Sequence, residues 1–81
     1  FKGEIYKYYS FDMEMKITYD KDADGAYIYF KEIKKGEVIK TISLNDSVNV
    51  DIDKEGKTIG IEILEASKNL PNSALDSAVF S

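Results

Sequence analysis

The most regular pattern along the chain is an alternation of aliphatic and polar residues in two neighbouring segments, residues 48–53 and 59–63. A period of two residues is typical of strands that bury one face. If residues 55–56 form a two-residue turn, the segments make a hairpin, and a slip of one residue would turn one apolar set toward water. The predicted cross-strand pairs are Lys54 with Lys57, Ile52 with Ile59, Val50 with Ile61, and Val48 with Ile63.

A second hairpin is predicted upstream, where residues 15–20 and 26–30 alternate on either side of a turn-rich stretch. We expect a four-residue loop, which leaves two tyrosines on the face of the sheet opposite the aliphatic side chains. The closing pair is Lys21 with Ala26, the next pairs are Tyr19 with Ile28 and Ile17 with Phe30, and the two tyrosines are Tyr27 and Tyr29.

A further strand is predicted over residues 37–44, in which Lys40 interrupts the apolar pattern and indicates an edge or rim position. The connections between the predicted strands are short. Short connections favour antiparallel neighbours, because a parallel pair needs a crossover of about a dozen residues or more. The sheet is therefore expected to be an antiparallel meander.

Residues 70–80 predict a short helix that covers the apolar face of this sheet. Asn72 or Ser73 can cap its N-terminus, and Leu75 and Val79 are spaced as neighbours on one helix face. The predicted fold class is α+β, a four- or five-stranded antiparallel β-meander with a short C-terminal helix packed on one face.

Residues 15–81 are expected to form this single β-rich domain, with residues 1–14 as an N-terminal extension. The apolar residues of the extension follow neither a strand period nor a helix period. We expect an added strand there in preference to a helix or a loose arm.

The composition narrows the classes of function. The chain has 81 residues, of which 43% are hydrophobic and 32% charged, as in one globular domain. It contains no histidine and no cysteine, which excludes His-based catalytic triads, cysteine nucleophiles, His or Cys zinc sites and disulfides. We therefore expect a protein that is not an enzyme and that carries no cofactor.

The charge is acidic and unevenly distributed. All 11 basic residues are lysines, against 15 acidic residues, and the excess acids lie in residues 41–81, which hold three lysines and seven acids. An acidic chain without arginine is a poor candidate for a phosphate backbone, so no nucleic-acid partner is expected. No apolar run approaches the ~20 residues of a membrane span, so we expect no membrane association and a cytoplasmic location.

Two motifs of the chain resemble those of a known family. Residues 15–28 read MKITYD, then AD and AYI, and residues 50–67 read VDID, a glycine, and GIEILEAS. In this order they resemble the small prokaryotic family called domain of unknown function 2283, with a departure at Gly25. The resemblance implies a compact β-rich domain without an established activity, cofactor or catalytic residue. It also implies an antitoxin-like binding role, because some relatives occur beside small toxin-like partners.

The turn of the central hairpin carries acidic residues at the spacing of an EF-hand calcium loop. The flanking segments alternate with a period of two residues, however, and the predicted register places Glu62 opposite Asn49, several residues from the turn. We interpret this segment as a solvated acidic turn and expect no metal site. The residues at positions 1, 3, 5, 6 and 12 of the formal motif are Asp51, Asp53, Glu55, Gly56 and Glu62.

Asp51 and Glu62 are also a candidate pair for acid–base chemistry. The register places Asp51 opposite Gly60 and thus diagonal to Glu62, about 7–8 Å apart by standard sheet geometry. An alternative function is therefore a small hydrolase or ligand-binding domain that uses these exposed carboxylates. An open sheet face offers no desolvated cleft that would shift a pKa, so we prefer a non-enzymatic function.

The face of the sheet opposite the aliphatic side chains is the candidate binding surface. It combines tyrosines and apolar residues with an acidic rim, which suits a small basic or toxin-like protein partner. Coverage by the N-terminal segment, tyrosines paired across strands, and a homodimer formed at a sheet edge are the alternatives. Gly60, inside a strand, predicts a β-bulge or the close approach of another group, and of these we prefer a ring of Tyr27 or Tyr29 lying across it. The residues of the predicted partner face are Tyr27, Tyr29, Ile39, Asp51, Asp53, Glu62 and Leu64.

Overall fold

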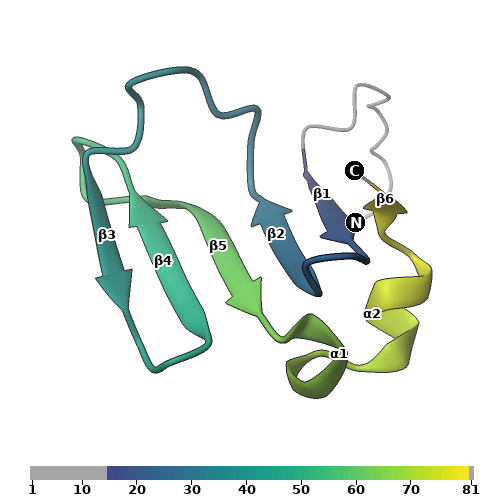
Figure 1. Cartoon of the computed structure of the whole chain (residues 1–81). Helices are drawn as coiled ribbons and strands as arrows, with labels where there is room; N and C mark the ends of the chain where they lie inside the picture. The colour runs from purple at the N-terminus through teal and green to yellow at the C-terminus, as the bar shows by residue number, and fades with distance from the viewer. Residues whose placement is uncertain (1–14, 81) are drawn as a thin grey trace, which may run out of the picture.

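The computed structural model describes residues 15–80, which form one sheet and two short helices (Figure 1). The predicted extra strand within residues 1–14 lies outside the described residues. The strands are β1 (Lys16–Asp20), β2 (Gly25–Tyr29), β3 (Lys40–Ser43), β4 (Val48–Ile52), β5 (Thr58–Leu64) and β6 (Val79–Phe80), and the helices are α1 (Ala66–Asn69) and α2 (Asn72–Asp76).

The predicted α+β fold with an antiparallel sheet and a C-terminal helix is confirmed. Strands β1 to β5 pair antiparallel, and the order across the sheet is β3-β4-β5-β2-β1-β6. This order departs from a simple meander at one point, because β2 lies beside β5 and β3 lies at an edge (Figure 1). The two-residue strand β6 adds a parallel neighbour to β1, after a crossover that contains both helices.

The hairpin of β1 and β2 has a loop of the predicted length that begins one residue earlier. The cause is Asp20, whose Oδ1 accepts hydrogen bonds from the backbone N–H groups of Asp22 and Ala23, at 3.1 and 3.3 Å. The observed cross-strand partner of each residue differs from the predicted one by two positions. Because two is an even number, every side chain still lies on its predicted face of the sheet. Asp20 pairs with Gly25 (predicted: Lys21 with Ala26), Tyr19 with Ala26 (predicted: Ile28), and Ile17 with Ile28 (predicted: Phe30).

Away from its turn, the hairpin of β4 and β5 has the predicted register. Next to the turn the register shifts, because Ile52 lies opposite Thr58 and not opposite Ile59 as predicted. Ile59 is the extra residue of a β-bulge; it is buried, and its carbonyl accepts a hydrogen bond from the Phe30 N–H at 3.0 Å. The confirmed pairs are Val48 with Ile63, Val50 with Ile61, and Asp51 with Gly60.

The bulge compensates for a longer loop. The predicted two-residue turn with Lys54 opposite Lys57 is wrong, because the Asp53 N–H donates to the Lys57 carbonyl at 2.9 Å and closes the loop there. The Asp53 carboxylate fixes this turn by accepting the N–H groups of Glu55 and Lys57, both at 2.9 Å. Gly56 has a φ of 82°, a left-handed conformation that glycine adopts without a steric clash.

Two helices follow β5 where one was predicted. α2 begins at Asn72 with Pro71 as its N-cap, so the predicted capping by Asn72 or Ser73 is wrong; Leu75 packs against the core. The predicted helical pairing of Leu75 with Val79 is wrong, since the chain leaves the helix to pair with β1, and Val79 lies in β6 and is exposed. The four-residue α1 was not predicted. Neither helix within residues 15–80 has the length and apolar character needed to cross a membrane.

The core lies on one face of the sheet, where the helices contact the strands. Ala26, Ile63 and Ala66 are buried there. On the same face, toward β3, Ile42 and Leu44 are 39% and 65% exposed. The helices therefore cover the central strands but not the β3 edge. The partly buried residues packed against the core are Tyr19, Val48, Ile61, Leu70 and Leu75.

Candidate functional site

Cross-strand pairing brings most of the predicted partner face together on the side of the sheet opposite the core. Tyr29 and Asp51 both lie opposite Gly60, one on each side of β5. The next row along the strands pairs Tyr27 with Glu62. Leu64, the last residue of β5, completes this group. The group, called the tyrosine face below, consists of Tyr27, Tyr29, Asp51, Glu62 and Leu64.

The ring of Tyr27 lies across Gly60 on the neighbouring strand. A β-carbon at Gly60 would lie 2.1 Å from the Tyr27 hydroxyl oxygen and 2.6 Å from its Cζ atom, so only glycine leaves room for the ring. The predicted close approach of a tyrosine to Gly60 is confirmed. The physical reason is that a ring on one strand can occupy the space left by a missing side chain on the next.

The Tyr27 hydroxyl donates a hydrogen bond to Oδ2 of Asp51 at 2.5 Å. The Thr41 hydroxyl donates to Oδ1 of the same carboxylate at 2.6 Å, so Asp51 connects side chains from β2, β3 and β4. Burial, followed by the bond to Asp51, raises the pKa of Tyr27 above its ordinary value of 10.0. At neutral pH Tyr27 therefore keeps its proton and acts as a hydrogen-bond donor.

Glu62 lies opposite Asn49 and diagonal to Asp51, as predicted. Asn49 donates from Nδ2 to Oε1 of Glu62 at 3.0 Å. This position directs Glu62 away from the turn at Asp53, so the EF-hand spacing in the sequence does not become a calcium loop. Within residues 15–80, no three His, Cys, Asp or Glu side chains gather in an arrangement that could hold a metal ion.

Tyr29 makes the second aromatic contact of the tyrosine face. Its ring centroid lies 4.7 Å from that of Tyr27, with the rings at 60° to one another. Lys16, opposite Tyr29 on β1, places its Nζ atom 5.3 Å from the Tyr29 centroid. The two tyrosines thus contact each other along one strand, whereas the cross-strand contacts of Tyr27 are with Gly60 and Asp51.

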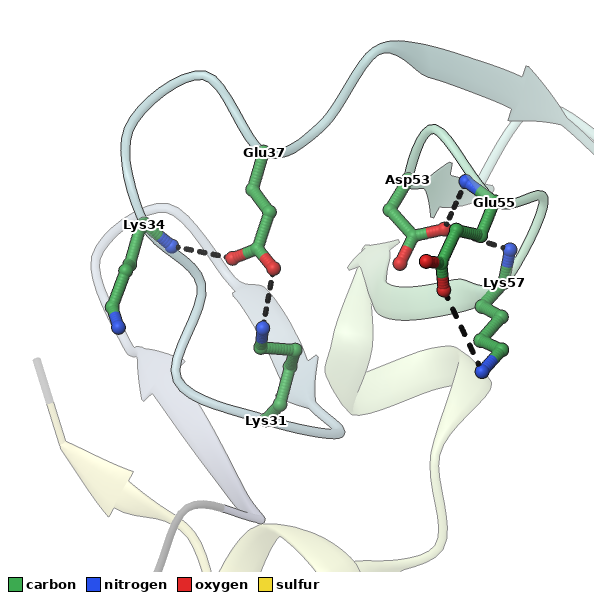
Figure 2. A network of polar contacts seen from close by, with 6 residues as sticks. All are labelled: Lys31, Lys34, Glu37, Asp53, Glu55 and Lys57. Atoms are coloured by element: carbon green, nitrogen blue, oxygen red, sulfur yellow. Dashed lines mark hydrogen bonds and ion pairs between the residues drawn. The ribbon is translucent and has the colours of Figure 1, made fainter.

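Ile39 and Asp53, the two remaining predicted members of the partner face, line a hollow of about 430 Å³ that residues of the tyrosine face do not line. The hollow lies between the loop of residues 31–37 and the turn of residues 53–55, and Figure 2 shows the polar side chains of these two segments. Its lining consists of Lys31, Lys34, Lys35, Gly36, Glu37, Ile39, Asp53, Lys54 and Glu55.

The acidic side chains Glu37 and Asp53 of this hollow are held by groups of the chain itself (Figure 2). Lys31 forms an ion pair with Glu37, and this bond lowers the pKa of Glu37. The backbone N–H of Lys57 is the main group that lowers the pKa of Asp53. Ile39, with 62% of its surface exposed, is therefore the residue of the hollow best placed for an apolar contact.

A further polar cluster, which was not predicted from the sequence, joins the first hairpin to α1. Oδ1 of Asp24 accepts the Tyr19 hydroxyl at 2.7 Å and the Ser67 N–H at 2.9 Å, and Oδ2 accepts the Ser67 hydroxyl at 2.7 Å. The hydrogen bond from the Ser67 side chain contributes most to a lowered Asp24 pKa. Asp24 and Ser67 are 43 residues apart in the chain, so no local sequence pattern predicts this contact.

The Asp24 cluster joins the two ends of the stretch that resembles a known family. Residues 16–67 match the family described as "Protein of unknown function (DUF2283)", and Ser67 is the last matched residue. The chain belongs to the DUF2283 family. The resemblance noted from residues 15–67 is thereby confirmed.

Two relatives of this DUF2283 domain carry no assigned activity in their names. "Uncharacterized protein MJ0789" of Methanocaldococcus jannaschii is 45% identical over 56 residues, which is 69% of this chain and 45% of the relative. "Uncharacterized protein YuzE" of Bacillus subtilis is 36% identical over 56 residues, 67% of this chain and 43% of the relative. The chain thus spans less than half the length of each relative. No solved structure matches it significantly.

Proposed function

We propose that this DUF2283 domain is a non-enzymatic interaction module that binds a small basic protein through its tyrosine face. The observation that carries the proposal is the placement of the helices. The core residues packed with α1 and α2, such as Ala26 and Ile63, lie on the opposite face of the sheet, so the described helices leave the tyrosine face uncovered.

The side chains of this face suit a protein partner. Tyrosine rings supply large, rigid contact areas, and Tyr27 and Tyr29 are already ordered by their contacts with each other and with Asp51. Leu64 adds an apolar side chain that is 41% exposed. Ordered side chains lose little conformational freedom when a partner binds, which favours affinity.

The charge of the face supports a basic partner. Asp51 and Glu62 lie on neighbouring strands, and the whole chain carries a net charge of −4. Complementary charge accelerates association and disfavours acidic competitors. An acidic module that binds a small basic toxin-like protein, as an antitoxin does, is the specific form of this proposal. The hydrogen bonds that Asp51 accepts from Tyr27 and Thr41 support a structural use of this carboxylate in preference to acid–base catalysis.

The test compares Glu62→Lys with Asp76→Lys. Both residues are exposed acids, and both substitutions change the net charge by the same amount, but Asp76 lies at the end of α2. Proteins captured from the source cells by the tagged wild-type chain are identified by mass spectrometry. A captured basic protein is then purified, and its affinity for each variant is measured by calorimetry.

We expect Glu62→Lys to weaken this complex about tenfold or more, and Asp76→Lys to leave it nearly unchanged, because a reversed charge in an interface is costly. Tyr29→Ala is expected to weaken the complex as well. Circular dichroism spectra that match the wild type show that the variants fold. Equal effects of Glu62→Lys and Asp76→Lys, or capture of no basic protein, would overturn the proposed function.

A further inference from the structure

The outer strand β3 carries unpaired backbone groups along one side. Within residues 15–80, its only neighbour in the sheet is β4, and all four of its residues are exposed. The Leu44 N–H donates to the Val48 carbonyl at 2.8 Å, which places Leu44 in a hydrogen-bonded pair with β4. Because this pairing alternates along an antiparallel strand, Ile42 also directs its N–H and C=O to β4, whereas Thr41 and Ser43 direct theirs to the open side.

Apolar side chains are concentrated at the same edge. Seven large hydrophobic residues are exposed in the described part of the chain, and three of them, Ile39, Ile42 and Leu44, fall within six consecutive positions. Lys40 is the one charged residue among those six. Proteins protect an open edge with short strands, charges, prolines or bulges; β3 is short and carries one lysine but no proline, so its protection against the addition of a strand is partial.

We propose that β3 pairs antiparallel with β3 of a second copy of this chain, so that one continuous sheet crosses the dimer. A two-fold axis perpendicular to the sheet keeps each residue on its own face, and the outward backbone groups of Thr41 and Ser43 must meet. Both conditions hold when Thr41 lies opposite Ser43 of the second copy. Ile42 then lies on the axis and contacts its own symmetry mate in a closely spaced pair.

Charge and side-chain type favour a second copy as the occupant of this edge. In the proposed register Lys40 lies opposite Leu44 of the other copy and diagonal to Asp46, within reach of a long side chain. The aliphatic part of Lys40 then covers an exposed leucine, while its ammonium group approaches a carboxylate. A parallel pairing of the same strands in a closed dimer would instead turn the second copy over, so that the two core faces would lie on opposite sides of the sheet.

The other antiparallel registers that keep the faces aligned form fewer hydrogen bonds between the backbone groups of the two β3 strands. A shift toward the C-terminus would pair residues 44–46, which belong to the turn before β4 rather than to the strand. A shift toward the N-terminus places Thr41 on the axis and moves Lys40 away from Asp46. The register with Ile42 on the axis uses strand residues alone for its hydrogen bonds.

The contact is small, so the dimer is expected to be concentration-dependent. The Thr41 and Ser43 pairs supply about four backbone hydrogen bonds, and the apolar contact is limited to Ile42, Leu44 and the stem of Lys40. Stable dimers usually bury a larger interface, about 1,000 Å² or more. We therefore expect a dissociation constant in the range of about 10 µM to 1 mM.

The test is sedimentation equilibrium of the full 81-residue chain over about 10 µM to 1 mM, with charge reversals as the main variants. Lys40→Glu should weaken the dimer about tenfold or more, because it places an acid beside Asp46. Adding Asp46→Lys to Lys40→Glu should restore the dimer. Both residues are exposed, so the fold should survive each substitution.

Thr41→Pro tests the backbone contact. It removes an N–H that faces away from β4, where proline is tolerated in an edge strand, and it should abolish the dimer. Leu44→Lys is matched with Leu64→Lys, since both leucines are exposed but Leu64 lies on β5. Leu44→Lys should weaken the dimer and Leu64→Lys should not.

Three results would overturn the proposal. They are a monomer at every concentration, a dimer in which Lys40→Glu is not rescued by Asp46→Lys, and a dimer lost with Leu64→Lys but kept with Leu44→Lys. None of these measurements involves the basic partner, so the dimer and the proposed function can fail independently.

Discussion

The two faces of the sheet reach stability by different physical means. On the core face, aliphatic side chains such as Ile63 are buried by strands and helices, so the stabilisation comes mainly from removing apolar surface from water. On the tyrosine face, Tyr27 fills the space above Gly60 and bonds to Asp51, so that face depends on one ring contact and a polar network. The core face thus contributes mainly to the stability of the fold, whereas the tyrosine face holds ordered side chains that the described helices do not cover.

The largest predicted difference in stability is between two isoleucines on the core face, one buried in the core and one at the uncovered β3 edge. Ile63→Ala removes a side chain that is 6% exposed and should lower the free energy of unfolding by about 2–4 kcal/mol. Ile42→Ala, at the uncovered β3 edge, should lower it by about 1 kcal/mol or less, because this side chain is 39% exposed. Urea denaturation followed by circular dichroism measures both.

The first of these losses is large for a domain of this size, so Ile63→Val serves as a milder second variant, with an expected loss of about 0.5–1.5 kcal/mol. If Ile42→Ala destabilised the fold as much as Ile63→Ala, the β3 edge would belong to the core.

The next effect concerns two strand glycines on the tyrosine face. Gly60→Ala should lower the free energy of unfolding by about 1–3 kcal/mol, because the new methyl group displaces the Tyr27 ring. Gly25→Ala is the matched control: a β-carbon there has no atom within 4 Å, so stability should stay the same or rise slightly. Thermal unfolding compares the two, and equal losses would show that Tyr27 does not depend on the space above Gly60.

The smallest effect concerns the link that holds α1 to the first hairpin. Hydrogen bonds from Ser67 and Tyr19 lower the pKa of Asp24 in the folded state below its ordinary value of 3.8. A carboxyl group with a lowered pKa stabilises the fold above its unfolded pKa, and the stabilisation disappears as the pH falls through the folded pKa. Asp24→Asn should therefore lower the melting temperature at pH 7, and this difference should shrink below about pH 4.

The shift itself can be observed by NMR titration of the Asp24 carboxyl carbon in the wild-type chain. A difference between wild type and Asp24→Asn that stays constant from neutral to acidic pH would contradict an ionised Asp24 as the stabilising group.

The turns show where sequence reasoning was insufficient. Alternation predicted the pairs of Val48 with Ile63 and of Val50 with Ile61, because a strand with one buried face tolerates no one-residue slip. It did not predict where the first turn begins or how long the second loop is, because both turns begin at an aspartate whose carboxylate accepts backbone N–H groups, Asp20 and Asp53. Such local bonds leave little trace in a hydrophobic pattern.

The candidate site was predictable to a similar extent. Period-two spacing placed Tyr27, Tyr29, Asp51 and Glu62 on one face, and an isolated strand glycine indicated that a ring lies near it. The position of Ile39 and Asp53 in a separate hollow depended on the path of residues 31–37, for which no periodic signal exists.

The sequence by itself determined the α+β class, the family, the two hairpins and the face on which each strand residue lies, because these follow from local periodicity and motif order. The tertiary structure decided which hairpins lie side by side. It placed β2 beside β5 and brought Asp24 to Ser67 across 43 residues, whereas Lys40 had already indicated the edge position of β3. Such contacts depend on which distant segments bury their apolar faces against one another. The local pattern of a chain with short loops is compatible with more than one such arrangement.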